Sequence, residues 1–104
     1  MKHPLSVVII TKNEERNIER CLRSVRWADE IVILDSGSVD RTVEICRAYH
    51  CTIIQTPWLG FGRTKQKAIE AASNDWVLSL DADEEVTEAL GKSVQTILEN
   101  PDCT

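Results

Sequence analysis

Residues 5–25 read LSVVIITKNEERNIERCLRSV, and the change of pattern within them decides the fold class. The β-branched run at 5–10 is the kind that a strand buried on both faces requires. The segment after it predicts a helix, because its apolar residues recur at i, i+3, i+4 and i+7: Ile18, Cys21, Leu22 and Val25. Asn13 is expected to cap this helix, with Glu14 and Glu15 in its first turn.

The same alternation continues along the rest of the chain. The further predicted segments are strands at 30–35, 52–55 and 76–80, helices at 42–49 and 63–72, and a last helix capped by Thr87. In the last helix we expect the apolar side chains to face inward: Leu90, Val94, Ile97 and Leu98. This order predicts a three-layer α/β/α domain over residues 1–104, with a parallel four-stranded sheet. If the sheet is doubly wound, its strand order is 3-2-1-4.

Composition narrows the functional class. The 104 residues are 42% apolar and 28% charged, which are globular proportions, and the net charge of −5 argues against a general nucleic-acid binder. The longest apolar run, about half a dozen residues, is too short to span a bilayer, and the N-terminus lacks a signal-peptide pattern. Four cysteines without a CxxC pair, and only two histidines, argue against zinc and favour reduced thiols in a cytoplasmic protein.

Polar residues follow three of the four predicted strands at the points where the strands end. They are TKNE at 11–14, DSGS at 35–38 and DAD at 81–83. In a doubly wound sheet, ligands bind outside the carboxyl ends of the strands, at the switch between the first and fourth strands. We therefore expect these three segments to form one binding site.

The acidic run DADEE at 81–85 has two interpretations. Acids just before a helix commonly cap it and interact favourably with its dipole, which needs no ligand. Alternatively, Asp81 and Asp83 flank a single residue in a turn, so both carboxylates can reach one hard cation such as Mg²⁺ or Mn²⁺. Asp35 is expected at the same edge, and this combination favours a metal that offsets the charge of a phosphate group.

Several other phosphate-handling classes lack their motifs here. There is no GxGxxG after the first strand and no GxxxxGK[ST], so a dinucleotide-binding Rossmann fold and a P-loop are not indicated. A two-component receiver would have an acidic pair after its first strand, and a haloacid-dehalogenase-type phosphatase would have Thr or Val where Glu85 stands. A sugar nucleotidyltransferase would have a Gly-rich loop near position 12.

Three motifs in order resemble the family 2 glycosyltransferases, which have the GT-A fold. They are SVVIITKNEERNIERCLRSV, DEIVILDSGSVDRTVEIC and NDWVLSLDADEEV, and together they span essentially the whole chain. The stretch QTPWLGFGRTKQKAIEAA is similar to the bacterial subgroup of lipopolysaccharide core β-glucosyltransferases. Two positions depart from the pattern, because Val39 stands where the family usually has Thr and Arg63 where the subgroup often has Pro.

The resemblance implies a nucleotide pocket formed by residues of these motifs: Thr11, Asn13, Glu14, Asp35, Lys65 and Asp81. It further implies that Asp35 accepts a hydrogen bond from uracil and that Asp81 contacts the ribose. Asp83 would bind the Mg²⁺ or Mn²⁺ ion that holds the diphosphate of a UDP-sugar.

The resemblance also implies what the chain acts on. The expected reaction is metal-assisted, inverting transfer of glucose from UDP-glucose to a glycan or lipid-linked acceptor in the cell envelope. It would take place at the inner face of the cell membrane, with peripheral association. The acids after Asp83 are better explained as helix cap and solvated surface: Glu84, Glu85, Glu88, Glu99 and Asp102. No catalytic base is identifiable, so we expect the donor-binding N-terminal half of an enzyme.

Two alternatives from other classes stay open, a non-catalytic nucleotide-binding or assembly module and a Mg²⁺-dependent phosphatase. The order 3-2-1-4 also leaves the apolar strand at 76–80 at the sheet edge, which favours a homodimer through this strand.

Overall fold

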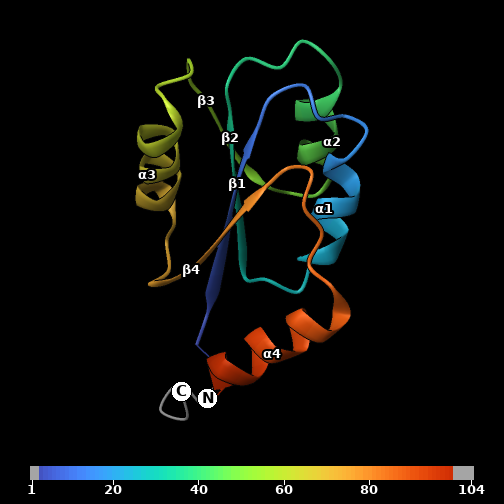
Figure 1. Cartoon of the computed structure of the whole chain (residues 1–104), viewed down its shortest axis with the longest axis vertical. Coiled ribbons are helices and arrows are strands. Elements are labelled where there is room, and N and C mark those ends of the chain that lie inside the picture. The colour runs from blue at the N-terminus through green and yellow to red at the C-terminus, as the bar shows by residue number, and fades with distance from the viewer. Residues whose placement is uncertain (1–2, 100–104) are drawn as a thin grey trace.

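The computed structural model describes residues 3–99. Strands and helices alternate strictly: β1 (Leu5–Thr11), α1 (Ile18–Ser24), β2 (Glu30–Asp35), α2 (Thr42–Ala48), β3 (Thr52–Gln55), α3 (Phe61–Ala71), β4 (Trp76–Asp81) and α4 (Glu88–Glu99). Helices α1 and α2 cover one face of the sheet and α3 covers the other, as Figure 1 shows. The predicted α/β class and three-layer arrangement are confirmed.

The sheet is parallel throughout and has the predicted order, β3-β2-β1-β4. Thr11 at the end of β1 lies opposite Asp35 at the end of β2. On its other side, β1 pairs with β4, and Ile10 lies opposite Asp81. The register therefore brings the polar carboxyl ends of β1, β2 and β4 together at one end of the sheet, which is toward the top in Figure 1.

Alternation along the central strands divides the core into two layers. Val7 and Ile9 pack with Ile33 against the α1 and α2 side, whereas Val8 and Val32 pack with the α3 side. The predicted apolar face of α1 is completely buried in the first layer: Ile18, Cys21, Leu22 and Val25. Since β1 and β2 are buried on both faces, their sequences are near-continuous apolar runs and not alternating patterns.

The predicted start of α1 is wrong. The helix begins at Ile18, with Asn17 and not Asn13 at its N-cap, and Asn17 makes no capping hydrogen bond with its side chain. Asn13 has a φ of +53°, a left-handed conformation that asparagine tolerates better than most residues. Its side chain therefore shapes the β1–α1 loop. Helix α3 also starts earlier than predicted, at Phe61, after Gly60 with a φ of +91°.

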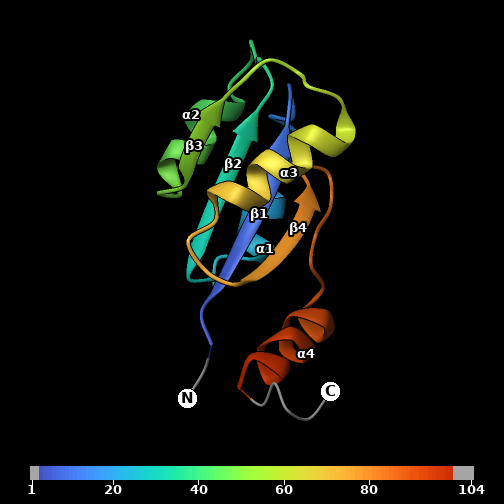
Figure 2. The same ribbon diagram turned by 90° about the vertical axis from the view of Figure 1, so that its left-hand side faces the viewer.

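Helix α4 agrees with the prediction at its start and departs from it on its faces. Thr87 caps it as expected, because its Oγ1 accepts the Leu90 N–H at 3.1 Å. Leu90 and Ile97, however, are 50% and 40% exposed, so the inward orientation predicted for them is wrong. The reason is position: α4 lies beyond the amino-terminal edge of the sheet, where Figure 2 shows it apart from both helical layers. Only Gly91 and Leu98 are buried in it.

Gly91 gives a prediction about stability. It lies inside α4, and a Cβ added there would meet the Trp27 ring at 3.5 Å, an ordinary contact distance. Glycine inside a helix costs about 0.5–1 kcal/mol relative to alanine. We expect Gly91→Ala to raise the free energy of unfolding by roughly that amount, measured by urea denaturation. A loss of stability would show that Trp27 cannot accommodate a methyl group.

No helix within residues 3–99 is long and apolar enough to cross a membrane. Cys21, Cys46 and Cys51 are free thiols. Cys103 and Asp102 lie outside the described residues.

Candidate functional site

The site is built on the loops that leave the carboxyl ends of β1, β2 and β4. The structure brings the β1–α1 loop, with Asn13 and Glu14, against the β2–α2 loop that follows Asp35. Asp81 and Asp83 follow β4 on the other side of β1. Three of the predicted segments therefore lie at one edge, and the strand register is the cause.

Asp35 has no exposed surface, and its carboxylate is engaged by its own loop. Its Oδ2 accepts the Gly37 N–H at 3.2 Å and the Ser38 N–H at 2.9 Å, while the Ser38 hydroxyl donates to Oδ1. These bonds satisfy a buried carboxylate and fix the turn after β2. In this conformation a uracil ring would reach Asp35 only if neighbouring groups moved.

Two hydroxyls beside Asp35 are buried and have no hydrogen-bond partner among residues 3–99. They are Thr11 Oγ1 at the end of β1 and Ser36 Oγ directly after β2. Buried polar atoms in folded proteins nearly always have hydrogen-bond partners, so each one without a partner needs an explanation. Thr11 was predicted as a pocket residue. Ser36 belongs to the DSGS segment expected at the site, but no role was predicted for its hydroxyl.

The β1–α1 loop holds Asn13 and Glu14 in different ways. Asn13 is exposed, and its Oδ1 accepts the Val39 N–H at 2.8 Å. Glu14 is half-buried, and its carboxylate accepts the Asn17 side-chain N–H at 3.1 Å. Val39, the departure from the family pattern, is 90% exposed, so no buried contact depends on its side chain.

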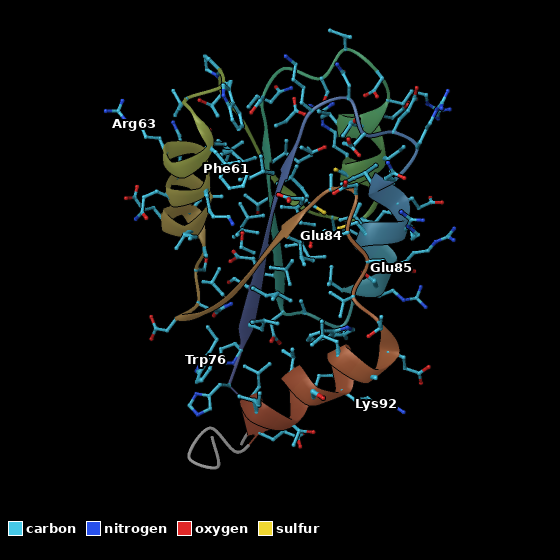
Figure 3. The ribbon with its side chains drawn as sticks, viewed as in Figure 1. Phe61, Arg63, Trp76, Glu84, Glu85 and Lys92 are labelled. Atoms are coloured by element: carbon cyan, nitrogen blue, oxygen red, sulfur yellow. The ribbon has the colours of Figure 1, made fainter. Side chains whose placement is uncertain are left out.

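The acids of the 81–85 run differ in their contacts. Glu84 acts as a cap for the turn, because its Oε1 accepts the Asp81 N–H at 2.7 Å. The carboxylates of Asp81 and Asp83 are exposed, and neither takes part in a hydrogen bond or an ion pair among residues 3–99. Figure 3 shows Glu84 and Glu85 on the segment that passes beside α1. Glu84 thus closes the turn after β4 and does not cap α4, whose cap is Thr87, so helix capping leaves Asp81 and Asp83 unexplained.

Negative charge dominates around this segment. Arg20 on α1 reaches it, donating from Nη2 to the backbone oxygen of Asp83 at 3.4 Å. The pKa of the Cys21 thiol on α1 is raised to about 12. Burial is the main cause, and the nearby Glu84 and Asp83 carboxylates add to it. The ion pairs of the described residues lie elsewhere: Arg23–Glu19, Arg41–Glu44 and Lys92–Glu88. Such an excess of carboxylates favours a cation at this edge.

The side chains at the carboxyl end of β4 supply some, but not all, of the ligands that a hard divalent cation needs. Asp81 and Asp83 supply carboxylate oxygens, which Mg²⁺ and Mn²⁺ prefer. No group of three acidic, histidine or cysteine side chains able to hold a metal occurs within residues 3–99. Mg²⁺ commonly takes only one or two protein carboxylates, and water and substrate phosphates complete its coordination. The donor set therefore suits a metal that binds together with a diphosphate.

Lys65 lies on α3, which covers the opposite face from α1. Its Nζ lies 5.1 Å from the centre of the Phe61 ring, a cation–π contact, and it forms no ion pair with Asp35, Asp81 or Asp83 in the described structure. Arg63 points away from the sheet, as Figure 3 shows. The described structure thus shows no contact between Lys65 and the acidic side chains at the carboxyl ends of the strands.

The family model described as "Glycosyl transferase family 2" matches residues 6–104. An uncharacterized glycosyltransferase of Rickettsia bellii is 42% identical over 94 residues, which cover 89% of this chain and 32% of that protein. The lipopolysaccharide core biosynthesis glycosyltransferase LpsC of Rhizobium meliloti is 37% identical over 102 residues, which cover 93% of this chain and 38% of LpsC. The chain thus spans about a third of the length of these curated relatives.

Solved structures show the same arrangement. Residues 1–349 of S. aureus TarS superimpose with a TM-score of 0.78 at 28% identity, covering 94% of this chain and 33% of that TarS chain. Glucosyl-3-phosphoglycerate synthase of Mycobacterium tuberculosis, solved with Mn²⁺, UDP and glucosyl-3-phosphoglycerate, superimposes with a TM-score of 0.68 at 27% identity, covering 80% of this chain and 36% of the synthase. The match of the family model over nearly the whole sequence shows that this chain, with its GT-A strand order, belongs to glycosyltransferase family 2.

Proposed function

We propose that this chain is the N-terminal donor-binding part of a glycosyltransferase that uses a UDP-sugar and a divalent metal. The observation that carries the proposal is the pair of exposed carboxylates at the carboxyl end of β4, Asp81 and Asp83, which have no hydrogen-bond or ion-pair partner among residues 3–99. Support comes from family membership and from the relatives solved with UDP, UDP-GlcNAc and Mn²⁺.

In this proposal Asp83 binds Mg²⁺ or Mn²⁺, which supplies charge neutralisation for the departing diphosphate when bound. Asp81 contacts the ribose. Thr11 lines the same pocket, because its buried Oγ1, which has no partner among the described residues, can bond to an ordered water or, after local movement, to a ligand. Asn13 and Glu14 shape the loop above it, and Lys65 offers a positive charge from α3. Asp35 fixes the turn after β2 at the base of the pocket, and it contacts the uracil only after local movement.

The transfer itself is proposed for the longer protein. The donor sugar would be glucose and the acceptor a cell-envelope glycan or lipid-linked sugar, as the similarity to LpsC supports. Transfer would take place in the cytoplasm, with peripheral association at the inner face of the membrane. An inverting transfer needs a carboxylate base, and no acid between Asp83 and residue 99 has an environment that indicates that role. Glu88, for example, pairs with Lys92 at 3.4 Å on the surface of α4.

The test is a calorimetric titration of the chain with UDP, with and without Mn²⁺. We expect binding that needs the metal, because the diphosphate would otherwise approach uncompensated carboxylates. ADP serves as a matched control for recognition of the base. Failure of a folded chain to bind UDP under either condition would contradict the proposal. Hydrolysis of simple phosphate esters would instead identify a phosphatase.

A second function, a non-catalytic nucleotide-binding module, follows if this chain acts alone without a base. It predicts metal-dependent UDP binding with no sugar release when acceptors are added. Transfer by this chain alone would rule it out.

We also propose that β4 pairs with a second copy, because it is one of the two edge strands of the described sheet, the other being β3. A monomeric mass by light scattering at high concentration would contradict this.

A further inference from the structure

We propose that Ser38, Asp40 and Thr42 are positioning residues that clamp the β1–α1 loop onto the β2–α2 loop and so preform the donor pocket. The inference rests on the proposed function for its effect on UDP, whereas the clamp itself is a feature of the ligand-free chain.

Three successive backbone amides of the β1–α1 loop carry the argument. The Asn13 N–H donates to Ser38 Oγ at 2.8 Å, the Glu14 N–H to Thr42 Oγ1 at 2.9 Å, and the Glu15 N–H to Asp40 Oδ2 at 3.2 Å. Each amide thus has its own side-chain acceptor, and all three acceptors come from one loop and the first residue of α2.

A return bond closes the clamp. The Val39 N–H donates to Asn13 Oδ1 at 2.8 Å, so Asn13 is held by its backbone and its side chain at once. This double hold explains how Asn13 keeps its left-handed φ of +53°, which a loop without such constraints would rarely maintain.

The acceptors are themselves fixed. Ser38 donates its hydroxyl proton to the buried Asp35, and Thr42, which has no exposed surface, donates to Asp40 Oδ1 at 2.5 Å. The Thr42 N–H also donates to Asp40 Oδ1 at 2.9 Å. The Thr42 hydroxyl lowers the pKa of Asp40, so the carboxylate stays ionised as an acceptor. Asn13 is therefore tied through Ser38 to Asp35, and Glu14 is tied through Thr42 to Asp40.

This arrangement has a consequence for binding. Without the clamp, the ligand would have to order the β1–α1 loop and the β2–α2 loop separately. With it, the two loops are ordered as one unit before the ligand binds, and such preorganisation improves affinity without adding a contact to the ligand. Removing a clamp hydroxyl should weaken UDP binding even though that hydroxyl need not touch UDP.

The experiment compares Ser38→Ala with Ser6→Ala. Both hydroxyls donate to a carboxylate and accept a backbone N–H, since Ser6 Oγ donates to Glu30 at 2.7 Å and accepts from Asn74 at 3.3 Å. Ser6 lies at the opposite end of the sheet, so its removal tests the cost of losing such a hydroxyl away from the site. Thr42→Val and the rescue variant Thr42→Ser form a second pair.

We expect Ser38→Ala and Thr42→Val to raise the Kd for UDP by about 3- to 10-fold, the scale of one lost hydrogen bond. Ser6→Ala and Thr42→Ser should leave the Kd near that of the wild type. In the ligand-free chain, the amide of Asn13 should exchange faster in Ser38→Ala, and that of Glu14 faster in Thr42→Val.

If the wild type binds UDP and both clamp variants bind it with the same Kd, the clamp inference is wrong and the proposed function still stands. Equal loss of affinity in Ser6→Ala would also overturn it, because the effect would then follow general destabilisation. A wild type that binds no UDP would overturn the proposed function, and unprotected amides at 13–15 would show that no clamp exists.

Discussion

Replacing Asp83 by alanine is expected to remove the metal-dependent part of UDP binding and to leave the fold intact. Asp83 is exposed, its carboxylate makes no hydrogen bond or ion pair among residues 3–99, and three other acids lie within two positions of it in the sequence. The loss of a ligand oxygen from a metal with few protein ligands should cost about 10- to 100-fold in affinity, or about 1.4–2.7 kcal/mol. Calorimetric titration with UDP and Mn²⁺ measures this directly.

The free energy of unfolding should change by less than about 0.5 kcal/mol, since the side chain is exposed. Glu85→Ala is the matched control, because it removes the same charge from the same run without removing a proposed ligand. If Glu85→Ala weakens binding as much as Asp83→Ala does, the effect is general electrostatics and Asp83 is no ligand.

Replacing Asp35 by alanine should damage folding and binding together. The change leaves the Gly37 and Ser38 amides and the Ser38 hydroxyl without their acceptor. Unsatisfied groups cost about 1–3 kcal/mol each when buried, and Gly37 is exposed enough to turn to water, so we expect a loss of about 2–4 kcal/mol in unfolding free energy. Urea denaturation gives the stability, and UDP titration of the folded fraction gives the affinity.

Asp35→Asn supplies the control for this prediction. Its amide oxygen can still accept the two backbone N–H groups, but its NH₂ cannot accept the Ser38 proton. It should therefore lose less stability than the alanine variant. An alanine variant as stable as the wild type would show that the turn after β2 does not depend on Asp35.

Periodicity alone was enough to predict the sheet. The runs at 5–10 and 30–35 are apolar and largely β-branched apart from Ser6 and the terminal Glu30 and Asp35, as expected of strands buried on both faces, and the alternation with helices leaves few ways to connect them. Thr87 was predictable as a cap because capping is a local interaction, between its Oγ1 and an amide three residues away.

The errors arose where distant partners override local preference. Asparagine is a residue type that often caps helices, but the Val39 amide and the Ser38 hydroxyl hold Asn13 in a different conformation. Leu90 and Ile97 have helical spacing, but α4 lies beyond the sheet edge, where little is available to cover them. Periodicity states which residues share a face and not whether anything packs against that face.

The sequence by itself determined which chemical groups follow each strand: hydroxyl and amide after β1, carboxylate and hydroxyls after β2, and four acids at the end of β4. Tertiary structure decided which of these groups remain available. Glu84 is used by the Asp81 amide and Asp35 by its own turn, whereas Asp81 and Asp83 keep exposed carboxylates. The clamp joins residues 25 and 28 positions apart, and such bonds depend on the register of β1 against β2, which no local pattern encodes.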